Sequence, residues 1–318
     1  MKKRLLGNTG IKVSEIAFGG VEIGMPYGIG VTNKSDMLSI NEAVHLLHKA
    51  IDCGINFFDT ARMYGESERI MGKAFRDRRD EVVIATKCRH LIDTNGNLPS
   101  GDVLRLTIEN SLYESLKALG TEYVDIFMLH QADSRIVQYE AVLRTYSSLS
   151  VKGLNRVAGV STYTILETEE ALGNSLWNIL QVPFNLMDQR QEAYFQKANN
   201  QGVGIVVRSV LLKGLLSNRG KNLHPALKDV ENHIIRYTEL LEETDCDLSA
   251  LATKFALSFP EVSTVLVGID KKEYLEQSLK TADGIYLNNQ KLERAKKLAY
   301  PEPEFLNLPY WDKMNWLK

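Results

Sequence analysis

The sequence has few of the features that mark secreted, membrane-spanning or zinc-binding proteins. Its three cysteines, Cys53, Cys88 and Cys246, show no CxxC spacing, which favours reduced thiols over a disulfide framework or a zinc site. No run of about 18 apolar residues occurs, and the charged segment Met1–Leu6 is not followed by the apolar stretch of a signal peptide. We therefore expect a cytoplasmic protein with no membrane partner.

An excess of charge of one sign is also missing. The 38 lysines and arginines nearly balance 40 aspartates and glutamates, for a net charge of −2, so electrostatics give no reason to expect a nucleic-acid partner. With 44% hydrophobic and 25% charged residues, the composition is that of an ordinary globular protein. The length suits one α/β barrel of about 250 residues with additions.

What the chain does contain is a regular alternation of short apolar runs and longer helical patterns. Eight runs predict strands: Glu15–Gly19, Asn56–Asp59, Val82–Lys87, Tyr123–His130, Arg156–Ser161, Ile179–Phe184, Gly204–Val210 and Thr264–Gly268. Segments between them, such as Asn41–Cys53, Glu68–Arg76 and Val103–Leu119, space apolar residues as a helix does. Eight strand-helix units indicate a closed (β/α)₈ TIM barrel of the α/β class.

Two additions to the barrel are expected within a single domain over residues 1–318. Lys3–Ala17 predicts an N-terminal hairpin turning at Gly7-Asn8-Thr9-Gly10, with residues 1–14 outside the barrel. The strand rhythm is interrupted between Leu212 and Thr264 and again after Leu287. We expect extra helices there, including a C-terminal helix and tail over about residues 288–318.

Four polar residues lie at the ends of predicted strands, where TIM barrels place their active sites. Asp59, Lys87 and His130 end the second, third and fourth strands, and Tyr64 follows Asp59 by five positions. Adjacent strands would therefore bring a carboxylate, a phenol, an ammonium and an imidazole to one rim.

This combination suits the reduction of a carbonyl by hydride, which needs a proton donor for the nascent alkoxide. A phenol with a pKa near 10 is a poor donor at neutral pH, so we expect the Lys87 ammonium to lower the pKa of Tyr64. Asp59 would fix the lysine, and His130 would orient the substrate oxygen. Each residue alone has an ordinary structural explanation, but their joint placement favours catalysis.

A metal-dependent hydrolase is the natural rival on such a barrel. It would need clustered ligands at strand ends, for example two histidines one residue apart, and none is present. His45 and His48 belong to a predicted outer helix. Gly28 and Gly30 do not make a dinucleotide fingerprint, because position 33 is asparagine and no strand-turn-helix context surrounds them.

The segment Phe58–Glu68 reads FDTARMYGESE and resembles the aldo-keto reductase signature DTAxxYGxSE. The likeness extends from Leu5–Gly10, through Ala85–Lys87 and Asp125–His130, to Gly159–Thr162, and so covers most of the chain. The resemblance implies an NAD(P)-dependent oxidoreductase acting on a small-molecule carbonyl or alcohol, with Asp59, Tyr64, Lys87 and His130 as its catalytic tetrad.

The same resemblance implies a cofactor site along the later strands. Ser161, Thr162 and Gln181 would hold the nicotinamide carboxamide, although the family usually has asparagine where this chain has Thr162. Arg208 stands where the family often has an aromatic residue, so it would either stack on the nicotinamide or contact phosphate or substrate. The following loop, with Ser209, Leu211 and Gly214, would cover the pyrophosphate.

The adenosine end of the cofactor is expected after the eighth strand. By resemblance, Glu276 and Gln277 match the adenine-contacting pair, and Lys271 and Lys272 would bind a 2′-phosphate at a helix N-terminus. Asp270 and Glu273 oppose that phosphate. The balance of these charges favours NADP(H) over NAD(H).

The substrate and the assembly of the protein are less constrained. The segments Val21–Ser39 and Gln131–Arg135, and a tail with Tyr310, Trp311 and Trp316, are expected at the barrel mouth, where their polar and aromatic mixture suits a sugar or another small aldehyde. The alternative function is a non-enzymatic regulatory module that binds a nicotinamide nucleotide. The sequence leaves the oligomeric state open.

Overall fold

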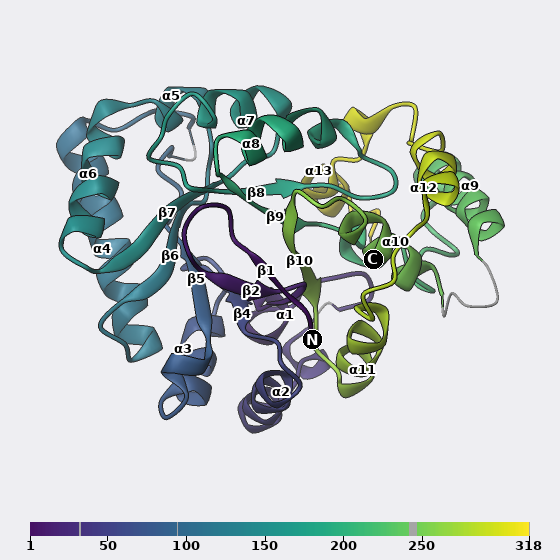
Figure 1. The fold of residues 1–318 in the computed structure, drawn as a ribbon, viewed down its shortest axis with the longest axis horizontal. Helices are drawn as coiled ribbons and strands as arrows, with labels where there is room; N and C mark the ends of the chain where they lie inside the picture. Colours follow the sequence, from purple (N-terminus) through teal and green to yellow (C-terminus); the bar gives the residue numbers. More distant parts are fainter. Residues whose placement is uncertain (32, 94, 242–246, 318) are drawn as a thin grey trace.

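The computed structural model describes residues 1–318 except 32, 94, 242–246 and 318. Eight parallel strands form a closed barrel, in the order β10-β3-β4-β5-β6-β7-β8-β9 (Figure 1). Their bounds are β3 Ile16–Gly19, β4 Phe57–Asp59, β5 Val83–Lys87, β6 Val124–Leu129, β7 Asn155–Ser161, β8 Ile179–Pro183, β9 Gly204–Arg208 and β10 Val262–Gly268. The predicted TIM barrel and all eight predicted strands are confirmed.

Helices surround the barrel and extend beyond it on one side (Figure 1). They are α1 Val21–Gly24, α2 Ile40–Asp52, α3 Ser67–Phe75, α4 Gly101–Leu119, α5 Ser134–Val137, α6 Glu140–Val151, α7 Ile165–Ala171, α8 Phe195–Asn200, α9 Lys228–Arg236, α10 Leu248–Leu257, α11 Lys272–Thr281, α12 Asn289–Lys296 and α13 Leu308–Lys313. Local signals explain their ends. Ser39 and Glu42 form a capping box at α2, and Gly120 ends α4 in the left-handed conformation, with φ of 64°.

Alternate residues of each barrel strand face two different hydrophobic layers. Ala17, Phe57 and Ile126 point into the barrel, whereas their neighbours Phe18, Phe58 and Phe127 pack against the helices. This alternation is the period-two pattern expected of a strand. The barrel interior is therefore filled, and a ligand can bind only at an end of the barrel.

The N-terminal hairpin closes one end of the barrel. Its strands β1 (Lys3–Leu5) and β2 (Lys12–Ser14) pair antiparallel, and Leu6, Ile11 and Val13 join the interior hydrophobic layer (Figure 1). Arg4 is bound to Glu15 and donates to the carbonyls of Leu257, Phe259 and Val262 at 2.9, 3.1 and 2.8 Å. The site must therefore lie at the opposite end, where the strands have their carboxyl ends.

Candidate active site

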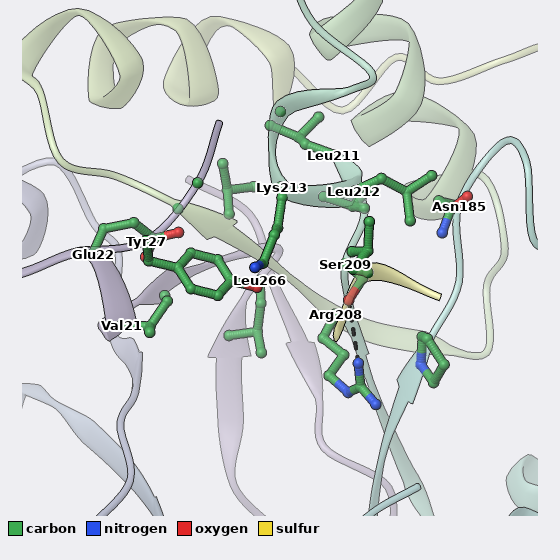
Figure 2. Close-up of a pocket in the computed structure, with 18 of the residues that line it drawn as sticks. Val21, Glu22, Tyr27, Asn185, Arg208, Ser209, Leu211, Leu212, Lys213 and Leu266 are labelled. Carbon is green, nitrogen blue, oxygen red and sulfur yellow. Dashed lines mark hydrogen bonds between the residues drawn. The ribbon is translucent and has the colours of Figure 1, made fainter. Parts of the chain in front are cut away.

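A cavity of about 790 Å³ opens at the carboxyl ends of the barrel strands (Figure 2). Asp59, Ser161, Gln181, Arg208 and Gly268 line it from the ends of β4, β7, β8, β9 and β10. Its volume is in the range of sites that bind small molecules and cofactors, about 300 to 1,000 Å³.

Lys87 contacts both Asp59, the predicted carboxylate, and Tyr64, the predicted proton donor. Its Nζ lies 2.6 Å from Asp59 Oδ2 and 3.4 Å from Tyr64 Oη, and it also donates to the carbonyl of Thr60 at 3.1 Å. Lys87 is fully buried, and Asp59 is 3% exposed. Asp59 Oδ1 accepts a second hydrogen bond from Gln181 Nε2 at 2.7 Å. Three strand ends are thus joined by one buried polar network.

Burial governs protonation in this network. It lowers the pKa of Lys87, while the Asp59 carboxylate opposes that shift. Burial and the nearby Asp59 charge raise the pKa of Tyr64 well above its usual value, against a smaller opposing effect of Arg208. The pKa of Tyr64 is therefore raised where we expected it to be lowered, because desolvation of the phenolate outweighs the opposing effect of Arg208.

His130, the residue directly after β6, lies beside the Tyr64 phenol. Its ring lies edge-on to the Tyr64 ring, with centroids 5.6 Å apart, and His90 lies 5.2 Å away on another side. Burial, helped by the charge of Lys87, holds the pKa of His130 well below 6.5. The imidazole is therefore neutral at neutral pH, and its buried Nδ1 has no hydrogen-bond partner among the described residues.

The signature motif fixes Tyr64 through close backbone packing. A Cβ atom on Gly24 would lie 2.0 Å from the Tyr64 carbonyl oxygen, and one on Gly65 would lie 2.3 Å from the Gly24 carbonyl oxygen. Gly65 also has a φ of +52°, which favours glycine. Behind the tyrosine, the buried Glu68 pairs with Arg62 and accepts from Thr86 Oγ1 at 2.6 Å.

The residues expected at the nicotinamide carboxamide do not all face the cavity. Ser161 Oγ donates to Gln181 Oε1 at 3.2 Å, and both residues line the cavity. Thr162 is buried, its hydroxyl lies 2.7 Å from that of Thr168, and it is not among the lining residues. Its neighbour Tyr163 lines the wall instead.

The loop after β9 forms one wall of the cavity in an unusual backbone conformation. Ser209, Leu212 and Lys213 have φ of 58°, 44° and 58°, and such left-handed non-glycine residues tend to gather at functional sites. This loop meets the segment after β3, since Ile29 N donates to the Lys213 carbonyl at 3.2 Å and Lys213 Nζ lies 4.7 Å from the Tyr27 ring centroid (Figure 2).

Only part of the set expected at the adenosine end faces the cavity. Gln277 lines it, whereas Glu276 lies on another face of α11 and pairs with Lys49 at 2.9 Å. Lys271 and Lys272 are exposed and do not line the cavity. The α11 residues that do line it follow helical spacing: Tyr274, Gln277, Ser278 and Thr281.

The cavity wall also contains charged residues to which the sequence assigned no individual role, among them Glu22 and Arg219. Glu22 packs against Gly268, where a Cβ would lie 2.1 Å from Glu22 Oε1, and its buried Oε2 has no partner among the described residues. Burial raises the pKa of Glu22 to about 8, and the charges of Asp270 and Asp59 add to the effect. Arg219 donates to Tyr274 Oη at 2.8 Å and to the Ile29 carbonyl at 3.2 Å. The sequence signal that could have identified Glu22 is its position as the one acid in the glycine-rich segment Gly19–Gly24 that follows the first predicted barrel strand.

The segments expected at the mouth contribute unequally. Tyr27 and Gly28 line the cavity, but no residue of Gln131–Arg135 does. In the tail, Trp311 is buried in the hydrophobic core, and the wall is formed by neighbours such as Asn307, Leu308 and Asp312.

Metal centres and membrane-spanning helices would indicate other classes of protein. In the described part of the chain, no group of three or more histidine, cysteine, aspartate or glutamate side chains is arranged to hold a metal ion. None of the helices within the same residues has the length and apolar character needed to cross a membrane. Cys53 and Cys88 are free thiols, and Cys246 lies outside the described residues.

Comparison with known proteins agrees with this geometry. The model of the Aldo/keto reductase family matches residues 15–299, so the chain belongs to that family of nicotinamide-dependent oxidoreductases. It is 27% identical to the uncharacterized oxidoreductase YqkF of Bacillus subtilis over 92% of this chain and 95% of the relative. It is also 27% identical to L-galactose dehydrogenase of Arabidopsis thaliana, over 87% and 86% of the two chains.

A solved structure agrees as well. The holo form of aldo-keto reductase AKR11C1 from Bacillus halodurans superposes with a TM-score of 0.77 at 25% identity, covering 94% of this chain and 96% of the other. The predicted family is thereby confirmed.

Proposed function

We propose that the protein is a nicotinamide-dependent carbonyl reductase in which Tyr64 is the proton donor. The observation that carries this proposal is the buried Lys87 ammonium, which lies 2.6 Å from Asp59 Oδ2 and 3.4 Å from Tyr64 Oη, behind the cavity wall that Asp59 and Tyr64 line. The bound reduced nicotinamide supplies a hydride to the carbonyl carbon. Tyr64 donates a proton to the carbonyl oxygen, so that the products are the alcohol and the oxidised nucleotide.

The surrounding residues prepare Tyr64 for that transfer. The raised pKa keeps the phenol protonated before reaction, and Lys87 stabilises the phenolate that forms once the proton has left. Asp59 holds Lys87 in place. Neutral His130 can donate a hydrogen bond to the substrate oxygen and so increase the positive character of the carbonyl carbon.

The cavity wall fits a nicotinamide dinucleotide. Ser161 and Gln181 offer a hydroxyl and an amide to the carboxamide, while Gln277 and Ser278 face the cavity near its α11 wall. Arg208 also lines the cavity wall, where its guanidinium hydrogen-bonds to Ser209 Oγ and to the Thr162 carbonyl. Thr162 and Glu276 are left out of the proposed set because they bond elsewhere.

We propose NADP(H) as the preferred cofactor, with Arg219 in place of Lys271 and Lys272 as the residue that contacts its 2′-phosphate. Arg219 lines the cavity between the β9 loop and Tyr274, and it forms no ion pair within the described residues. A guanidinium in that position suits a phosphate group. Asp270 also lines the cavity and opposes a phosphate there, so the preference depends on Arg219.

We further propose that the substrate is a small polar aldehyde such as a sugar. Asn185, Asp188 and Asn307 add hydrogen-bonding groups to the cavity wall, and the relative named L-galactose dehydrogenase supports this class. The free thiols of Cys53 and Cys88 are consistent with a cytoplasmic enzyme.

The test is the variant Tyr64→Phe, measured with NADPH and a panel of aldehydes and sugars. We expect kcat to fall by about 10² to 10⁴, since the proton donor is lost, while NADPH affinity stays within about threefold because the phenol is not a proposed cofactor contact. Tyr113→Phe, on the exposed face of α4, is the matched control and should match the parent. Near-normal turnover by Tyr64→Phe would remove the assignment. Tight NADPH binding without turnover of any carbonyl by the parent would favour the regulatory module.

A further inference from the structure

Arg208 brings to the cavity wall a positive charge that has no direct ion-pair partner among the described residues. It ends β9, and Figure 2 shows its side chain with the hydrogen bond from Nη1 to Ser209 Oγ, 3.2 Å long. Nη2 donates to the Thr162 carbonyl at 2.8 Å, and the guanidinium lies 4.3 Å from the centroid of the Tyr163 ring. All of these partners are neutral.

The lack of a carboxylate sets Arg208 apart from the structural arginines of the barrel. Arg4, Arg62 and Arg79 are each paired with a buried acid: Glu15, Glu68 and Asp125. Arg208 has no such ion pair among the described residues, and its Nε is sealed from solvent without a hydrogen-bond partner. Arg208 is only partly buried and lines the cavity, so its charge faces the site and not an acid of the fold.

The charge of Arg208 reaches the catalytic residues. It contributes to lowering the pKa of both Lys87 and His130, after the larger effects of burial. Lys87 itself is neutralised by Asp59 at 2.6 Å. Among the described residues no carboxylate pairs directly with Arg208, although its charge also acts on the partly buried Glu167, where it opposes the larger effect of burial on the pKa.

We propose that Arg208 is a specificity residue that makes the site prefer the reduced over the oxidised nicotinamide nucleotide. This inference rests on the proposed function. The oxidised nicotinamide ring carries one positive charge and the reduced ring carries none, although the two are nearly the same size. Tyr64, Gln181 and Arg208 line the same cavity, so a ring that passes hydride to a carbonyl held by Tyr64 would lie within reach of the charge of Arg208.

The expected discrimination follows from Coulomb's law. For two positive charges about 7 to 8 Å apart, with the effective dielectric constant near 20 that suits protein sites, the repulsion corresponds to about 10- to 50-fold in binding after some screening. During reduction, Arg208 faces a neutral ring before hydride transfer and a cation afterwards. It therefore favours loading of the reduced nucleotide and release of the oxidised product.

The test compares dissociation constants, not rates. NADPH, NADP⁺ and 2′-phospho-ADP-ribose, which lacks the nicotinamide, are titrated by calorimetry into the parent, Arg208→Gln and Arg208→Lys. The ratio of the NADP⁺ to the NADPH dissociation constant should fall about 10- to 50-fold in Arg208→Gln. Arg208→Lys keeps the charge and should keep most of that ratio. Affinity for 2′-phospho-ADP-ribose should stay constant throughout.

The possible outcomes distinguish a failure of this inference from a failure of the proposed function. An unchanged ratio in Arg208→Gln overturns it, as does an equal loss for all three ligands, which would assign Arg208 to a phosphate. Failure of the parent to bind either NADPH or NADP⁺ would instead overturn the proposed function. Arg208→Met, neutral and of similar length, replaces the glutamine variant if circular dichroism shows that the latter is unfolded.

Discussion

Removing the carboxylate of Asp59 should lower the free energy of unfolding of the protein as well as its activity. In Asp59→Asn the Lys87 ammonium, which is fully buried, loses its counterion. The resulting loss of stability has an upper bound, because Lys87 can lose its proton and become neutral and need not remain a buried, unpaired cation. Deprotonation at pH 7 of a group whose ordinary pKa is about 10.4 costs roughly 5 kcal/mol, and breaking buried pairs typically costs about 3 to 5 kcal/mol. We expect a loss of that size in the free energy of unfolding.

The double variant Asp59→Asn/Lys87→Met tests whether the two residues act as one unit. Removing both charges leaves no unpaired ion, so its loss of stability should be about 3 kcal/mol smaller than the sum of the single losses. Its loss of activity should be little worse than that of the worse single variant. Urea unfolding gives the first quantity, and steady-state kinetics give the second.

The penalty in Asp59→Asn should also depend on pH. The folded variant binds its lysine proton less tightly than the unfolded chain, so its stability should rise relative to the parent between about pH 7 and pH 10. Glu109→Gln, which removes the carboxylate that pairs with Arg105 and Lys152 at the surface of α4, is the control and should cost no more than about 1 kcal/mol. Stability losses that add in the double variant, or a pH-independent penalty, would refute the reasoning.

Two further predictions concern the cavity wall. Arg219→Ala should weaken NADPH binding by about 10- to 100-fold and leave NADH binding unchanged. The control Lys271→Ala/Lys272→Ala should change the affinity for either nucleotide by less than about threefold. An equal loss of affinity for both nucleotides in Arg219→Ala would assign Arg219 to the pyrophosphate. Because the pKa of Glu22 is raised to about 8, the folded protein keeps a proton that the unfolded chain releases above about pH 4.5. The parent should therefore lose about 3 to 4 kcal/mol of stability relative to Glu22→Gln between pH 5 and 8. An equal dependence of the melting temperature on pH in the two proteins would contradict this.

The sequence predicted the barrel well because its strands are short apolar runs with clear ends. The same clarity placed Asp59, Lys87 and His130 at neighbouring strand ends, and the motif around Tyr64 located the phenol. These positions depend on the register of each strand, which alternation along the sequence reveals.

The less successful expectations depend on which way a side chain points. The phase of α11 decides that Gln277 faces the cavity while Glu276 pairs with Lys49, and Thr162 turns toward Thr168. The raised pKa of Tyr64 depends on burial, which the spacing of residues does not give. Arg219 reaches the cavity from a long loop that carries no periodic signal.

The contacts of Arg4 have a consequence for the order in which the chain can fold during synthesis. This residue, four positions from the start, is held by carbonyls at Leu257, Phe259 and Val262, and β3 completes its pairing only when β10 is present. Contacts that span most of the sequence form late and slow folding. The hairpin can therefore complete its contacts with the barrel only after Val262 has been made, and its apolar residues Leu6, Ile11 and Val13 lack part of their packing until then.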